Sequence, residues 1–272
     1  RGYGGTPPSV PLLVEKNTPA AHSGDEPLLL ARAHPQARVL VDPKRARSAQ
    51  WVCEEHSPDL LIMDDGFQHL ALNRNLNLVL MRPADLGDEW NAVIPAGSWR
   101  ERKKALGRAS VFLVKAGNDE FQKLKPVAQK RLAQFGKPVF NFCPKATGLE
   151  NLVSAEKRIS LDGEDYLLVS GVADPAPVWN TAKGLLGVAA REHVVFADHH
   201  PFTDHDWQDI ASKARTLGIR HLVMTGKDAV KYESQEGLEA WGIQLGLSWG
   251  KGLESESFST WFNNAWLQLT QK

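Results

Sequence analysis

Short unbroken apolar runs alternate with segments of helical periodicity along most of the chain. A short apolar run between polar residues predicts a buried strand, and apolar residues that recur every three or four positions predict an amphipathic helix. The predicted strands are residues 39–41, 60–63, 76–81, 110–115, 138–142, 166–170, 193–197 and 221–224. The predicted helices are residues 28–33, 43–55, 120–134, 178–186, 204–217 and 258–269. This alternation predicts an α/β protein whose sheets are mainly parallel and flanked by helices.

One segment interrupts the alternation. Residues 146–164 are polar and have no strong period, as expected of a boundary between domains. We therefore expect two domains, residues 1–145 and residues 146–272, each with its own strands and helices. A chain of 272 residues is long enough for two moderate domains with separate cores.

Composition narrows the classes of function. The 32 basic and 32 acidic residues balance to a net charge of +0, whereas general nucleic-acid binding requires a basic excess, so no nucleic-acid partner is expected. Cys53 and Cys143 are two isolated thiols, which predict neither a disulfide framework nor a thiolate zinc site and favour a reducing cytoplasm. No apolar run approaches the ~20 residues of a membrane-spanning helix. The chain as given is expected to be soluble or peripheral to a membrane.

The predicted strand 60–63 ends at two adjacent acids, Asp64 and Asp65. Ligands of open α/β sheets bind at the carboxyl ends of the strands, and an Asp in this position holds Mg²⁺ in P-loop nucleotidases. The alternative is that one of these acids caps the next helix. Gly66, Gln68 and His69 follow the pair, and this combination is far rarer than a single capping Asp. The segment is therefore the first candidate site, although His69 alone would be explained by a supporting or capping role.

Two further strand ends carry polar clusters. Asp198, His199 and His200 follow one strand, and Lys227 follows another. A carboxylate beside an imidazole forms a general-base unit, because the acid orients the ring and favours its protonated form. A purely structural histidine is the alternative, and Lys227 has two open interpretations, a phosphate contact or solvent exposure.

A phosphate-binding loop of the form G-x-x-x-x-G-K-[ST] is absent from the 272 residues. The chain instead begins with a glycine-rich string, Arg1-Gly2-Tyr3-Gly4-Gly5, with no initiator Met and no strand before it. Such a loop normally leaves a strand, so we expect that the chain was cut from a longer protein.

Six strings occur in the order seen in the tetraacyldisaccharide 4'-kinases, the lipid A kinases of Gram-negative bacteria. They are Arg1-Gly2-Tyr3-Gly4-Gly5, Gly24-Asp25-Glu26-Pro27, Asp64-Asp65-Gly66-Phe67-Gln68-His69, Pro95-Ala96-Gly97 with Arg100-Glu101, Asp198-His199, and Lys227-Asp228-Ala229-Val230-Lys231. The chain resembles this family from Arg1 to about Lys231, and the string around Asp64 is the most specific of the six.

The resemblance implies a two-domain α/β kinase whose first domain, here truncated, is P-loop NTPase-like. Its cofactors would be ATP and Mg²⁺, and its partner a lipid A precursor, tetraacyldisaccharide 1-phosphate. In the family a P-loop and an N-terminal helix on the inner membrane precede the equivalent of Arg1. The resemblance thus implies a peripheral protein on the cytoplasmic face of the inner membrane, attached through a segment missing here. The fragment alone is expected to be soluble, to bind ATP poorly and to turn over little.

Individual residues carry over on the matching strings. Asp25 resembles the catalytic Asp of the family and His199 its partner, which together would take the proton from the sugar 4'-hydroxyl. Asp64 and Asp65 resemble the acids on the Mg²⁺ side. Gln68, His69 and Arg100 match positions that line the nucleotide cleft. Two questions stay open: Asp25 is also well placed as the N-cap of the helix at 28–33, and His200 could share the role of His199.

Two other functions compete with the kinase. Asp198-His199-His200 spells the name motif of the DHH phosphoesterases, although the Asp-x-Asp pattern that those enzymes carry near their N-terminus is absent. A non-catalytic module that binds a lipid or a partner is the second alternative, since a kinase without its P-loop could retain only its binding surface.

Overall fold

The computed structural model describes residues 9–271, and the chain folds into two compact units. Unit 1 groups the residues up to Ile62 with residues 146–246, and unit 2 groups residues 63–145 with 247–272. This grouping differs from the expected division of the chain between residues 145 and 146. The chain enters unit 2 after Ile62 and leaves it after Lys145, and the last segment, 247–272, returns to it. Each unit is therefore built from two separate stretches of sequence.

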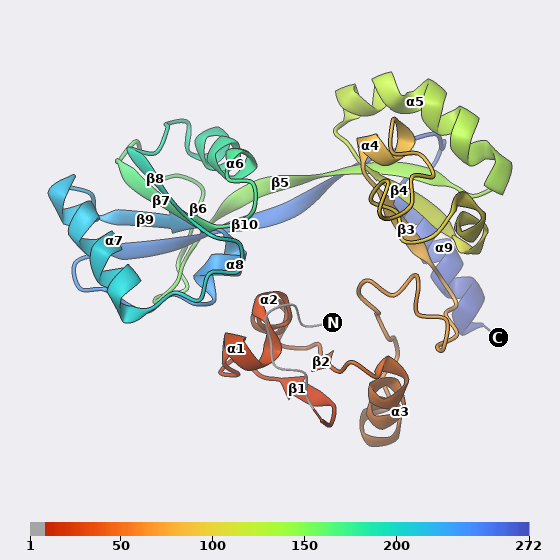
Figure 1. Ribbon diagram of the computed structural model, residues 1–272, viewed down its shortest axis with the longest axis horizontal. Coiled ribbons are helices and arrows are strands. Elements are labelled where there is room, and N and C mark those ends of the chain that lie inside the picture. The colour runs from red at the N-terminus through yellow and green to blue at the C-terminus, as the bar shows by residue number, and fades with distance from the viewer. Residues whose placement is uncertain (1–8, 272) are drawn as a thin grey trace. The chain divides into compact units, whose positions relative to one another are not determined.

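Unit 2 is a small parallel α/β layer (Figure 1). Strand β4 pairs in parallel with β3 on one side and with β5 on the other. The elements of this unit are β3 (Leu78–Met81), α4 (Pro83–Leu86), η1 (Lys103–Arg108), β4 (Val111–Lys115), α5 (Asn118–Leu132), η2 (Ala133–Phe135), the first part of β5 (Val139–Asn151), the end of β10 (Glu239–Gly250), and α9 (Phe258–Thr270).

Successive side chains of β4 enter two different cores, as the two-residue period of a strand requires. Phe112 and Val114 join the cluster that α5 covers, whereas Val111 and Leu113 join a second cluster against which Phe258 and Trp261 of α9 pack. This two-sided burial explains why β4 is an almost unbroken apolar run in the sequence.

Unit 1 holds a second parallel layer and a smaller N-terminal part. Strand β7 lies between β8 and β9, and β9 pairs with β10, all in parallel. The elements of this layer are the end of β5, β6 (Lys157–Arg158), β7 (Tyr166–Gly171), α6 (Ala176–Leu186), β8 (Glu192–Phe196), α7 (Asp204–Thr216), β9 (His221–Met224), α8 (Gly226–Ala229) and most of β10. The N-terminal part comprises β1 (Leu12–Val14), α1 (Ala20–Ser23), α2 (Asp25–Ala33), β2 (Val39–Val41) and α3 (Arg45–His56), and β1 pairs with β2 antiparallel.

Helices α6 and α7 cover opposite faces of this layer (Figure 1). Along β7, Tyr166 and Leu168 join the cluster under α6, while Leu167 and Val169 join the cluster under α7, which includes the fully buried Trp207. The prediction of an α/β fold with mainly parallel strands flanked by helices is thus confirmed. None of the helices described between residues 9 and 271 has the length and apolarity needed to cross a membrane.

The predicted strand at residues 60–63 is wrong. These residues have no regular secondary structure, and Ile62 is 86% exposed. An apolar run becomes a strand only where a neighbouring strand offers a hydrogen-bonding edge, and no strand within residues 9–271 pairs with this one. The acid pair that follows therefore lies on a loop.

Several other boundaries also differ from expectation. Strand β5 continues through residue 151 into the segment predicted to be an irregular boundary, where Leu149 and Glu150 pair with β6. Strand β10 was not predicted, because glycines at 242, 246 and 250 interrupt its apolar pattern. Helix α7 begins with a capping box: Thr203 Oγ1 accepts a hydrogen bond from Asp206 N, and the Asp206 carboxylate accepts one from Thr203 N.

Candidate functional site

The first group of predicted site residues assembles in unit 1. Asp25 is the first residue of α2, and His199 lies in the turn after β8. Nδ1 of His199 is 3.1 Å from Oδ2 of Asp25. The Asp25 side chain is only 8% exposed, whereas that of His199 is 29% exposed. A buried carboxylate bonded to a more accessible imidazole is the arrangement of a general-base unit.

The helix start gives Asp25 its position without using its side chain as a cap. Gly24, with φ of 85°, is the N-cap of α2, and no side chain caps this end. The interpretation of Asp25 as N-cap is therefore wrong, because the helix begins one residue earlier than that role requires. At the first helical position the carboxylate instead gains from the partial positive charge of the helix N-terminus.

Sequence reasoning assigned no role to Lys231, which joins this pair. Its Nζ lies 2.7 Å from the same Oδ2 of Asp25, and its side chain is 9% exposed. Lys231 follows α8, four residues after Lys227, and the latter pairs with Asp198 at 2.6 Å.

Asp198 is the second carboxylate near His199, with Oδ1 4.0 Å from Nε2 of the ring. The hydrogen bond from Lys227 holds the pKa of Asp198 below its ordinary value, with burial opposing and the charge of Lys227 adding to the effect. Each of the two acids beside His199 thus has a lysine as counter-charge.

A buried carboxylate fixes the short helix α8, which carries Lys227 and precedes Lys231. Asp228 is fully buried, and its Oδ2 accepts hydrogen bonds from Gly171 N at 3.0 Å and from Thr225 Oγ1 at 2.7 Å. The bond to Gly171 ties α8 to the end of β7. A side chain at Gly171 would lie 3.1 Å from both Asp228 Oδ1 and Ala197 O, so the close approach favours glycine there.

His199 and His200 face different partners. His199 has φ of 58°, a left-handed conformation that is uncommon for a non-glycine residue and that concentrates at functional sites. His200 instead stacks on Phe196, with ring centroids 4.6 Å apart, and its Nε2 lies 3.1 Å from Asp206 Oδ2 at the start of α7. The hydrogen bonds of Thr203 are the largest cause that lowers the pKa of Asp206 to about 2, and the bond of His200 adds to them.

The second group of predicted residues assembles in unit 2. Nη1 of Arg100 lies 2.9 Å and 2.8 Å from the two carboxylate oxygens of Asp65. Asp64 and Asp65 are exposed, and Asp65 has φ of 47°. Arg100 and Asp65 therefore meet, on a loop and not at a strand end.

Two arginines hold this loop in place. Arg108 stacks on the ring of Phe67 at 4.5 Å, and its Nη2 donates to Phe67 O at 3.3 Å. Arg74 donates hydrogen bonds to the carbonyls of Phe67 and His69. Several carbonyls of the segment are thus fixed by guanidinium groups, which gives a loop without ladder partners a defined shape.

The remaining predicted residues lie within the same network. Glu101 accepts two hydrogen bonds from Arg108, at 3.0 Å and 2.7 Å, and these bonds, together with a weaker one from Gln68, lower the pKa of Glu101. Nε2 of His69 is buried and has no hydrogen-bond partner within the described part of the chain. A buried orphan of this kind is a polar group still available to a ligand or to water.

The strand-like turn before Arg100 depends on a glycine. Ile94 N and Trp99 O are 2.9 Å apart, and Trp99 N donates to Ala92 O at 3.0 Å. A Cβ at Gly97 would lie 2.3 Å from Ala92 Cβ and 2.4 Å from Ala92 O, which no ordinary contact allows. The Pro95-Ala96-Gly97 string therefore positions Arg100 through close packing of the backbone.

The acid pair fits Mg²⁺ better than a metal held by protein alone. No group of three or more His, Cys, Asp or Glu side chains that could hold a metal occurs among residues 9–271. Mg²⁺ keeps several waters and commonly takes only one or two carboxylates besides substrate phosphates. Exposed Asp64 and Asp65 suit that coordination. The predicted glycine string Arg1-Gly2-Tyr3-Gly4-Gly5 lies outside the described residues.

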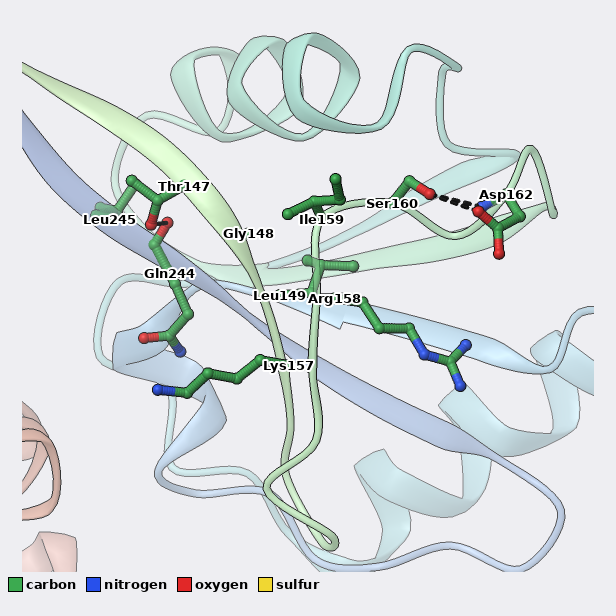
Figure 2. A pocket seen from close by; sticks show the side chains of 10 residues that line it. All are labelled: Thr147, Gly148, Leu149, Lys157, Arg158, Ile159, Ser160, Asp162, Gln244 and Leu245. Carbon is green, nitrogen blue, oxygen red and sulfur yellow. Dashed lines mark hydrogen bonds between the residues drawn. The ribbon is translucent and has the colours of Figure 1, made fainter.

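A separate hollow of about 640 Å³ lies in unit 1 along β5, β6 and β10 (Figure 2). None of the predicted site residues lines it. The lining residues are Thr147, Gly148, Leu149, Lys157, Arg158, Ile159, Ser160, Asp162, Gln244 and Leu245.

Comparison with known proteins places this geometry in a family. The family model described as tetraacyldisaccharide-1-P 4'-kinase matches residues 1–265. The tetraacyldisaccharide 4'-kinase of Nitratidesulfovibrio vulgaris is 43% identical over 273 residues, which cover 100% of this chain and 76% of that protein. The enzyme of the same name from Pseudomonas putida strain GB-1 is 33% identical over 277 residues, covering 100% of this chain and 73% of that protein.

A solved structure is similar to the fold. The crystal structure of LpxK from Aquifex aeolicus in complex with ATP has a TM-score of 0.70 and 24% sequence identity, covering 95% of this chain and 74% of that chain. The family match spans the Asp25 and His199 pair of unit 1 as well as the Asp65 and Arg100 pair of unit 2. The six strings in the sequence, the two polar groups formed by residues from the five strings that the structure describes, and the similarity along the whole chain agree, and the chain belongs to the tetraacyldisaccharide 4'-kinase family.

Proposed function

We propose that this protein transfers the γ-phosphate of ATP to the 4'-hydroxyl of tetraacyldisaccharide 1-phosphate, and that Asp25 and His199 activate that hydroxyl. The observation that carries the residue assignment is the 3.1 Å contact between His199 Nδ1 and Asp25 Oδ2. The contact joins a buried acid to a more accessible imidazole from a distant part of the sequence.

In the proposed step, the pair formed by Asp25 and His199 accepts the proton of the 4'-hydroxyl while the hydroxyl oxygen attacks the γ-phosphorus. The bond between that phosphorus and the β,γ-bridging oxygen breaks, and ADP leaves with the bond's electron pair. Such a base typically contributes ~10²–10⁴-fold, and positioning together with charge neutralisation provides most of the remaining acceleration.

The proposed role of the acids of unit 2 is to bind the metal ion. Asp64 and Asp65 would hold Mg²⁺, which when bound neutralises charge on the nucleotide phosphates. Arg100 fixes Asp65 through contacts to both of its oxygens. Gln68 and His69 lie on the same loop, and the orphan Nε2 of His69 supports a ligand contact there.

The chemistry of the acceptor places the reaction at a membrane surface. A disaccharide with four acyl chains resides in a bilayer, so its kinase works on a headgroup at the interface. We therefore propose peripheral association with the cytoplasmic face of the inner membrane, where ATP is present.

The test is Mg²⁺-dependent transfer from ATP to tetraacyldisaccharide 1-phosphate, assayed with protein expressed from the complete coding sequence. The expected result is 4'-phosphorylation whose kcat Asp25→Asn lowers ~10²–10⁴-fold and Asp64→Asn also lowers, while the variants unfold at the wild-type temperature. Unchanged turnover in Asp25→Asn would refute the assignment of the base, and no transfer by the wild-type protein would refute the proposed reaction.

A further inference from the structure

Lys231 is the least exposed partner in any described lysine ion pair, and it contacts the proposed base directly. Its Nζ lies 2.7 Å from Asp25 Oδ2 and donates a hydrogen bond of 3.1 Å to His200 O. The side chains of Lys231 and Asp25 are 9% and 8% exposed, whereas Lys213 in the surface pair with Glu192 is 42% exposed. Because desolvating two charges is costly, a buried pair of this kind requires an explanation beyond stability.

The backbone around Lys231 is fixed to the helix that carries Asp25. Nη1 of Arg32, on α2, donates to Val230 O at 2.9 Å, and Val230 packs with Leu28 in one apolar cluster. Lys231 N donates to Asp228 O at 3.0 Å, and Asp228 is itself anchored at the end of β7. These contacts anchor the backbone that carries Lys231 and so hold its ammonium group next to Asp25.

Lys231 and His199 use the same oxygen of Asp25. Both contacts within the described residues fall on Oδ2, at 2.7 Å and 3.1 Å. These two donors restrain the Asp25 carboxylate through one of its oxygens. In the proposed reaction the other oxygen, Oδ1, accepts a hydrogen bond from the acceptor hydroxyl.

We propose that Lys231 is a positioning residue of the kinase reaction, which holds Oδ2 of Asp25, supplies its counter-charge and leaves Oδ1 for the acceptor hydroxyl. The inference rests on the proposed role of Asp25. Lys231 acts only through that carboxylate, so its effect should vanish when the carboxylate is removed.

The experiment compares Lys231→Met, Lys231→Arg and the surface control Lys213→Met in the protein expressed from its complete coding sequence. We expect Lys231→Met to lower kcat at least 10-fold, with KM for both substrates within twofold. Lys231→Arg, which keeps the charge, should recover part of kcat. Lys213→Met should behave as wild type.

One further measurement separates this inference from the proposed function and from misfolding. In an Asp25→Asn background, Lys231→Met should lower kcat by less than twofold, and the doubly neutral pair also removes the risk of an unpaired buried charge.

A Lys231→Met protein with normal kcat would overturn the inference while leaving the base assignment standing. If Lys231→Met alone does not fold, a kcat loss of twofold or more on adding Lys231→Met to Asp25→Asn would overturn it as well. Wild-type turnover in Asp25→Asn would instead reject both proposals together.

Discussion

Nδ1 of His199 and Oδ2 of Asp25 lie 3.1 Å apart, although 174 residues separate them along the chain. The contact joins the start of α2 to the turn after β8. A carboxylate in this place fixes the orientation and the tautomer of the imidazole, which is how an acid and a histidine come to act as one base.

The first prediction is that these two residues are not additive. Asp25→Asn and His199→Gln should each lower kcat by ~10²–10⁴-fold, because each removes the base unit. The double variant should lose little more than either single one, as residues acting together do. His205 and Asp209, an exposed pair 3.6 Å apart on α7, provide the control, and His205→Gln with Asp209→Asn should leave transfer unchanged. Losses that multiply in the double variant would show that Asp25 and His199 act independently.

The second prediction separates His199 from its neighbour. His200→Gln should keep kcat within about twofold of wild type, because the His200 ring stacks on Phe196 and bonds Asp206 rather than Asp25. Its thermal unfolding temperature should fall, since those packing and hydrogen-bond contacts are lost. A loss of kcat in His200→Gln as large as that in His199→Gln would contradict the assignment.

The third prediction concerns stability at low pH. The pKa of Asp206 is lowered to about 2 in the folded protein, against ~3.9 in an unfolded chain. The stabilisation it contributes is therefore complete above pH 4 and is lost as the pH falls toward 2. Asp206→Ala should reduce the free energy of unfolding by ~1 kcal/mol at pH 7, the usual value of a cap.

Urea unfolding of wild type and Asp206→Ala between pH 7 and pH 2 checks the third prediction. The difference between the two proteins should shrink as the pH falls through this range. Asp204→Ala in the same helical turn is the control, because Asp204 lies outside the capping box. A difference that stays constant with pH would mean that the ionised carboxylate of Asp206 does not stabilise α7.

The fourth prediction tests the packing of the turn before Arg100. Gly97→Ala should destabilise unit 2 by ~1–3 kcal/mol, since its Cβ would lie 2.3 Å from Ala92 Cβ. Gly107→Ala is the matched control, because a Cβ at Gly107 meets nothing within 4 Å. Denaturant midpoints of the two variants give the comparison. Equal midpoints would show that the turn relaxes without cost.

The strands that could be predicted from the sequence are those buried on both faces of their sheet. Strands β4, β7 and β9 are covered on both faces, so their sequences are unbroken apolar runs that need no knowledge of their neighbours. Helix α7 carries a complete start and stop, with Thr203 before it and Gly218, with φ of 67°, after it. Local chemistry determines such elements.

The elements that were missed depend on distant neighbours. Strand β10 contains glycines where side chains from other segments approach closely. A Cβ at Gly242 would meet Leu152 at 3.1 Å, and one at Gly250 would meet Asn118 at 2.3 Å. The prediction of a strand at residues 60–63 failed for the opposite reason. The composition of this segment favours a strand, but the segment has no pairing partner among the described residues. Pairing, unlike composition, is not a local property.

The residues of the candidate site could be predicted from the sequence, but the contacts between them could not. The strings identified Asp25, His199, Asp65 and Arg100 through the family resemblance, and the structure pairs them two by two. Lys231 lies in one of the six strings and still had no assigned role, because its ion-pair partner, Asp25, lies near the start of the sequence. A long-range ion pair leaves no periodic signal.

The sequence distance between Asp25 and His199 has a consequence for protein synthesis. The ribosome makes the acid first and its histidine 174 residues later, and at ~5–20 residues per second that interval is roughly 9–35 s. Throughout it the buried carboxylate has neither His199 nor Lys231 beside it. A chain that stops before His199 therefore cannot form the reactive pair, and the order of translation delays activity until both His199 and Lys231 have been made.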